Sequence, residues 1–151
     1  MSKRFAVLTL ALTVAVATVL SASQAKPGSA PAPKSKVLAS LQGAWLMISS
    51  NGQDMAGSGQ EVIVTITDNK YVQTVNGQVV EQGTFKIDEA KKPLAVDIQI
   101  TEGENAGMSQ VGVLEVDGKT MSGKLGQPGT TVRPTDFATS EGFFTFTATK
   151  K

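Results

Sequence analysis

The stretch Leu94-Ala95-Val96-Asp97-Ile98-Gln99-Ile100 alternates aliphatic residues with small or polar ones at a period of two. In an extended strand, successive side chains point to opposite faces, so the four aliphatic residues share one face and Asp97 and Gln99 lie on the other. This pattern predicts a strand with one buried face and one solvated face.

The same pattern recurs along most of the chain. Together with this stretch it predicts eight strands, at residues 45–49, 61–67, 70–75, 79–87, 94–101, 108–116, 119–125 and 143–149. Short turn signals, Asp68-Asn69, Asn76-Gly77 and Asp117-Gly118, separate several of these strands and favour direct antiparallel hairpins.

The sequence indicates no helix between the strands that is long enough to serve as the crossover of a parallel sheet. Residues 37–41 have apolar residues at helical spacing, but they suffice only for a short helical turn. Eight antiparallel strands with one apolar face bury that face by closing into a barrel, which also removes exposed edges. We therefore expect an all-β, eight-stranded, antiparallel up-and-down barrel with a short N-terminal helical turn.

Alternation also predicts which side chains face the barrel interior. The candidate lining residues for a ligand are Phe85, Val96, Ile98, Leu114, Met121 and Phe146. Gly83, Gly112 and Gly123 fall on the same inner face, which slightly favours a cavity over a filled core. Whether eight strands enclose a cavity depends on side-chain volume, which the pattern does not determine.

The N-terminal residues have the composition of an export signal. Lys3-Arg4 precedes an apolar run, and Ser23 and Ala25 fit a signal-peptidase site, so we expect a cleaved signal peptide over residues 1–25. Residues 26–36 are rich in Pro, Ala and Lys and are expected to be a disordered tether. Residues 37–151 then form one barrel domain, secreted or periplasmic, with no membrane span after cleavage.

Composition excludes several functional classes. Removing Lys3 and Arg4 leaves 12 basic residues against 13 acidic ones, which gives neither a nucleic-acid footprint nor a polybasic membrane patch. The chain has no cysteine and no histidine. Disulfides, the commonest metal ligand and a histidine general base are therefore absent, and stability must come from packing and backbone pairing.

Leu41-Gln42-Gly43-Ala44-Trp45 resembles the GxW motif of lipocalins and related calycin barrels. From residue 41 to residue 150 the chain is similar to a family of small, exported, uncharacterised lipocalin-like domains of planctomycete-type bacteria. The further matching stretches are Gly83-Thr84-Phe85, Lys91-Lys92-Pro93, residues 112–118 and Arg133-Pro134-Thr135-Asp136-Phe137. Many members carry a Cys after the Asp-Gly turn, whereas this chain reads Met121-Ser122-Gly123-Lys124.

In that superfamily the Trp plugs one end of the barrel and a basic residue near the C-terminus packs across its indole face. The resemblance thus implies that Gly43, Trp45 and Arg133 close the barrel. Arg133 is the candidate partner because it is the only arginine of the expected mature chain. The family has no established activity, so the resemblance predicts a fold and leaves the function open.

We expect a non-enzymatic, monomeric binding protein without a cofactor. The loop 101–107 contains Glu102, Glu104 and Asn105, but it lacks the ligand spacing of a calcium loop and is expected to be a solvated turn without a metal. Ser58 has no histidine to activate it, and no catalytic residue is predicted. The expected partner is a small apolar or amphipathic ligand inside the barrel; the alternative is a cell-envelope protein or glycan contacted by the end loops of a packed barrel.

Overall fold

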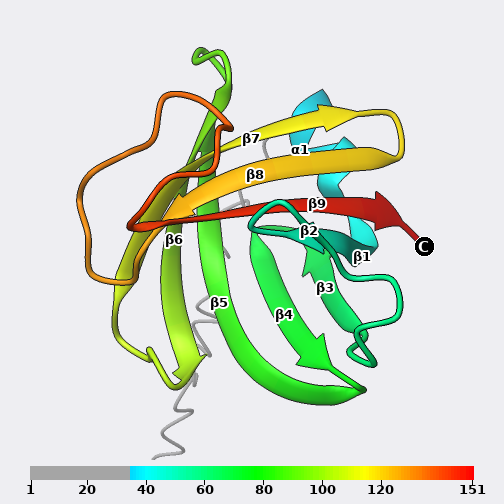
Figure 1. The fold of residues 1–151 in the computed structure, drawn as a ribbon. Coiled ribbons are helices and arrows are strands. Elements are labelled where there is room, and N and C mark those ends of the chain that lie inside the picture. Colours follow the sequence, from blue (N-terminus) through cyan, green and yellow to red (C-terminus); the bar gives the residue numbers. More distant parts are fainter. Residues whose placement is uncertain (1–34) are drawn as a thin grey trace, which may run out of the picture. The chain divides into compact units, whose positions relative to one another are not determined.

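The computed structural model describes residues 35–151 of the protein (Figure 1). The expected signal peptide and residues 26–34 of the expected tether lie outside these residues. The elements are α1 (Lys36–Leu41), β1 (Gly43–Ser50), β2 (Gln53–Asp54), β3 (Val62–Thr67), β4 (Lys70–Val75), β5 (Gln78–Asp88), β6 (Leu94–Gly103), β7 (Ser109–Asp117), β8 (Thr120–Gly126) and β9 (Phe143–Lys150).

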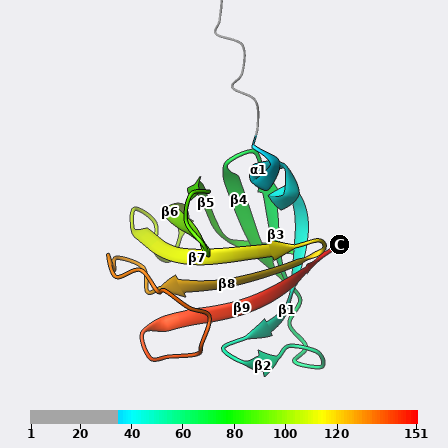
Figure 2. The same ribbon diagram turned by 90° about the horizontal axis from the view of Figure 1, so that it is seen from above.

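Eight of the strands form a closed antiparallel barrel (Figures 1 and 2). The strands β3 to β9 pair in sequence order, and β1 pairs with both β3 and β9, which closes the ring. The two-residue strand β2 pairs only with the end of β1, as a hairpin outside the ring. The predicted antiparallel, up-and-down, eight-stranded barrel is therefore confirmed.

Turn chemistry explains where several strands end. Asn76 and Gly77, between β4 and β5, have φ values of 51° and 81°, and Gly118 between β7 and β8 has a φ of 58°. Asn and Gly adopt such positive φ angles more readily than other residues, which allows the chain to reverse within two residues.

Helix α1 packs against one end of the barrel. The Ser35 side chain accepts a hydrogen bond from the Leu38 amide at 2.9 Å and so caps the helix. Leu41 is fully buried, and the Trp45 indole Nε1 donates to the Leu41 carbonyl at 2.7 Å. The expected tether therefore ends earlier than predicted, because Ser35 and Lys36 belong to the capped helix.

The up-and-down order places the loops at two opposite ends of the barrel. Beside α1 lie the start of β1 and the turns between β3 and β4, β5 and β6, and β7 and β8. At the other end lie the β1–β2, β4–β5 and β6–β7 turns and the long segment between β8 and β9. The first end is occupied by Leu41 and Trp45, so the second is the end from which a ligand could enter.

Candidate ligand-binding cavity

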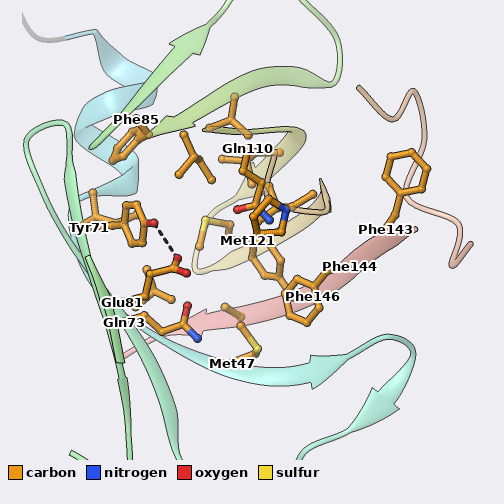
Figure 3. Close-up of a pocket in the computed structure, with 18 of the residues that line it drawn as sticks. Met47, Tyr71, Gln73, Glu81, Phe85, Gln110, Met121, Phe143, Phe144 and Phe146 are labelled. Carbon is orange, nitrogen blue, oxygen red and sulfur yellow. Dashed lines mark hydrogen bonds between the residues drawn. The ribbon is translucent and has the colours of Figure 1, made fainter. Parts of the chain in front are cut away.

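The barrel interior is hollow. It contains a cavity of about 370 Å³ whose wall comes from α1 and the strands of the ring (Figure 3). This volume lies within the range of small-molecule pockets, roughly 300 to 1,000 Å³, and matches the expectation that eight strands can hold one small ligand.

All six predicted lining residues lie on the cavity wall. Phe85 comes from β5, Val96 and Ile98 from β6, Leu114 from β7, Met121 from β8 and Phe146 from β9. Phe144 stacks with Phe146 at a centroid distance of 6.0 Å. The remaining apolar lining residues are Leu41, Met47, Val64, Ile66, Leu125, Pro128, Phe143 and Ala148.

The inner-face glycines do not open the cavity in the way the sequence suggested. A Cβ at Gly123 would lie 2.3 Å from the Phe146 ring, and one at Gly83 would lie 2.7 Å from the Tyr71 ring. At Gly112 a Cβ would lie 2.4 Å from Leu125 Cδ2. Large neighbours occupy the space that each glycine leaves, so the glycines allow close packing in a coiled sheet and the cavity lies elsewhere.

One side of the cavity wall is polar. The Tyr71 hydroxyl of β4 donates a hydrogen bond to Glu81 Oε1 of β5 at 2.8 Å, and Gln73 lies beside this pair (Figure 3). The register pairs Tyr71 with Gly83 and Gln73 with Glu81. Because Gly83 has no side chain, the phenol ring lies over it and reaches the carboxylate two residues away on the same face.

The Tyr71 side chain is buried, with an exposed fraction of 8%. Burial raises the pKa of its hydroxyl far above the ordinary value, and the hydrogen bond and negative charge of Glu81 raise it further. The hydroxyl therefore stays protonated at physiological pH, and its proton is directed toward Glu81.

Polar residues also line the cavity near the end opposite α1. Asn51, Asn105 and Gln127 belong to three of the loops at this end, the β1–β2 turn, the β6–β7 turn and the segment between β8 and β9. Asn51 is fixed, because its Oδ1 accepts from the Thr145 amide at 3.0 Å. Gln110 is also held, since its Nε2 donates to the Gly126 carbonyl at 2.7 Å.

The predicted partner of Trp45 was wrong. The cation over the fully buried indole is Lys150, whose Nζ lies 5.3 Å from the ring centroid and donates to the Ser40 carbonyl at 3.1 Å. Lys150 reaches Trp45 because β9 pairs with β1 and places the two residues directly opposite each other. Gly43, with a φ of 105°, begins β1 in a conformation that favours glycine.

Arg133 instead fastens the long segment between β8 and β9 to the barrel wall. Its Nη1 donates to the carbonyls of Val96 and Gly112 at 2.8 and 2.7 Å, and its Nη2 pairs with Asp97. The predicted closing residues are thus divided between two places: Gly43 and Trp45 lie at the α1 end, and Arg133 binds the strands β6 and β7.

The sequence pattern did not identify Tyr71, Gln73 or Glu81 as cavity residues. Alternation from Phe85 back through Gly83 to Glu81 was the signal that could have found the carboxylate. An inward carboxylate is unusual unless it has a hydrogen-bond partner, and that partner, the Tyr71 hydroxyl, is visible only in the folded chain.

Within residues 35–151 there is no group of three or more acidic residues arranged to hold a metal ion, and no helix there is long and apolar enough to cross a membrane. Comparison of the chain with protein-family models, with curated proteins and with solved structures gives no significant match.

Proposed function

We propose that this protein is a non-enzymatic binding protein that holds one small apolar or amphipathic molecule inside its barrel. The cavity of about 370 Å³ carries this proposal. Fifteen of its 22 lining residues are apolar, and a mostly apolar cavity with a few oriented polar groups is the usual form of a ligand site.

The size of the cavity limits the ligand. Its volume corresponds to about twelve molecules of liquid water at roughly 30 Å³ each. A ligand of about ten to twenty non-hydrogen atoms would therefore fill it. Compounds the size of a membrane phospholipid would not fit.

Non-covalent binding is favoured over catalysis by the chemistry of the wall. Among the lining residues there is no Ser, Thr or Lys that could act as a nucleophile, and Glu81 is the single carboxylate. Paired carboxylates, which general acid–base hydrolysis needs, are therefore not supplied by this wall.

The proposal also includes export of the protein and its relationship to lipocalin-like domains. The charged and apolar N-terminus supports a cleaved signal and a periplasmic or extracellular location. The GxW-like start of β1 and the barrel topology support a place among lipocalin-like domains. The cavity favours the carrier over the alternative interaction module, because that module was expected to have a packed barrel.

The direct test is saturable binding of the apolar fluorescent dye N-phenylnaphthylamine. We expect one dye per chain, and we expect Ile98→Phe, which adds volume to the wall, to weaken binding by about tenfold or more. Ile48→Phe is the matched control, because Ile48 is 40% exposed and does not line the cavity. Equal dye affinity in both variants, or no saturable binding, would contradict the proposal.

A further inference from the structure

The charge of the cavity wall narrows the class of ligand. Glu81 is the only charged residue among the 22 lining residues, and none of them is Lys or Arg. A ligand that carries a carboxylate, such as a fatty acid, would meet a like charge and no cationic partner there. A ligand that carries a cation would meet its counter-ion.

Hydrogen bonding leaves part of Glu81 available. Tyr71 occupies Oε1, and among residues 35–151 no group donates to Oε2. A carboxylate accepts several hydrogen bonds, so Oε2 can accept from a ligand while the Tyr71 bond persists. The Gln73 amide beside it has no hydrogen-bond partner within the described part of the chain and offers a second polar contact.

The Tyr71 hydroxyl can only accept a hydrogen bond from a ligand. Its proton is committed to Glu81, so toward a ligand the hydroxyl offers only its oxygen lone pair. Two adjacent acceptors, Glu81 Oε2 and the Tyr71 oxygen, therefore face a ligand. They suit a group with several N–H donors and a positive charge.

The polar group and the apolar wall lie in an order that fits an amphiphile. Along the inner face of β5, Glu81 is nearest the end opposite α1, and Phe85 and Ile87 follow toward the closed end. The fully buried Trp45 and Leu41 lie at that closed end. A head group at Glu81 would thus place an apolar tail deep in the barrel.

We propose that the ligand is a cationic amphiphile, a primary amine with an apolar tail, whose ammonium group binds Glu81 and Gln73 while its tail fills the cavity. This inference rests on the proposed ligand-binding function. It adds that the head group of the ligand is positively charged and that Glu81 selects it.

The test compares three ligands that share one tail: decylamine, decanol and decanoate. Each is titrated into the purified chain at neutral pH by calorimetry, below the concentration at which it aggregates. We expect decylamine to bind about tenfold or more tightly than decanoate. Decanol, which is neutral, should fall between them.

Two variants assign the preference to one carboxylate. Glu81→Gln should remove the preference for decylamine over decanoate and leave decanol binding within about twofold of the wild type. Glu102→Gln is the matched control, because it removes the same charge from an exposed residue that is bonded to Gln82 and does not line the cavity. That control should keep the full preference, and thermal unfolding should show that both variants fold.

The outcomes separate the two proposals. Binding of all three ligands with no amine preference, or a preference that persists in Glu81→Gln, would overturn the cationic-amphiphile inference and leave the binding function standing. No binding of any of the three, together with no saturable dye binding, would overturn both.

Discussion

Tyr71 is the only tyrosine of the chain, so its ionisation can be followed without interference from another phenol. Burial, and then the hydrogen bond and charge of Glu81, raise its pKa in the folded state. An unfolded tyrosine loses its proton near pH 10. Above about pH 10 the unfolded chain therefore binds fewer protons than the folded one, and stability falls as pH rises.

We expect the free energy of unfolding of the wild type to decrease more between about pH 8 and pH 10.5 than that of Tyr71→Phe. Urea unfolding at both pH values measures the difference. Lysine ionisation contributes equally to the two proteins and cancels in the comparison. Tyrosinate absorbance that develops near pH 10 while the barrel stays folded would contradict this account of the Tyr71 environment.

Lys150, and not the predicted Arg133, is the cation that lies over the indole ring of Trp45. Its Nζ contacts the Trp45 ring and the Ser40 carbonyl, so it joins β9 to both β1 and α1. We expect Lys150→Met to lower the free energy of unfolding by about 1 to 2 kcal/mol, from the lost cation–π contact and hydrogen bond. It should also change the fluorescence of Trp45, the only tryptophan.

Lys91→Met is the matched control for this variant, since Lys91 is exposed in the connection between β5 and β6. It should leave both stability and fluorescence near wild-type values. A Lys150→Met protein as stable as this control would show that the contact with Trp45 contributes nothing measurable.

At the scale of elements, the segment 127–142 between β8 and β9 depends on two anchors. Arg133 binds the carbonyls of β6 and β7, and the buried Lys124 pairs with Asp136 at 2.9 Å. Pro134 is buried between the anchors. Residues 133–136 therefore lie against the outer wall of the barrel, and Figure 1 shows the whole segment as the long orange loop.

We expect Arg133→Met to destabilise the protein by about 1 to 3 kcal/mol, because the two backbone carbonyls lose a charged donor. Proteolysis within residues 127–142 should accelerate, while dye affinity should change little because Arg133 does not line the cavity. A large loss of dye affinity with unchanged stability would place Arg133 in the binding site instead.

The sequence predicted the strands well because alternation is a local property. The predicted strand 70–75 coincides with β4, and the other strand limits differ from the predictions by at most two residues. The strand β2 was not predicted, because two residues are too short for any periodicity. Its existence depends on pairing with β1, which only the folded hairpin supplies.

The polar part of the cavity was harder to predict because it depends on which residues strand pairing brings together. Alternation along β5 runs from Phe85 through Gly83 to Glu81, and the register shift against β4 lies beyond Glu81, between Gln73 and Thr74. The pattern does not show that the Tyr71 hydroxyl donates to Glu81, and without such a partner an inward carboxylate is unusual. The partner of Trp45 was wrongly predicted for a similar reason. Arg133 and Lys150 are both basic and near the C-terminus, and only the pairing of β1 with β9 places Lys150 opposite Trp45.

At the scale of the whole molecule, an empty cavity links ligand binding to stability. Side chains that line an empty cavity lack packing contacts on one side, which lowers the stability of the unliganded barrel. A ligand that binds only the folded state raises that stability. At a free concentration one hundred times its Kd, a bound ligand stabilises the fold by about 2.7 kcal/mol, which should raise Tm by several degrees.

We therefore expect decylamine to raise the Tm of the wild type and of Ile48→Phe by similar amounts at equal saturation. Ile98→Phe should start from a Tm at or above that of the wild type, because the added ring fills empty volume, and it should lose most of the ligand-induced shift. Differential scanning calorimetry of the three proteins, with and without ligand, measures both quantities. If Ile98→Phe were strongly destabilised, the added ring would be meeting packed side chains, and the wall at Ile98 would not border free space.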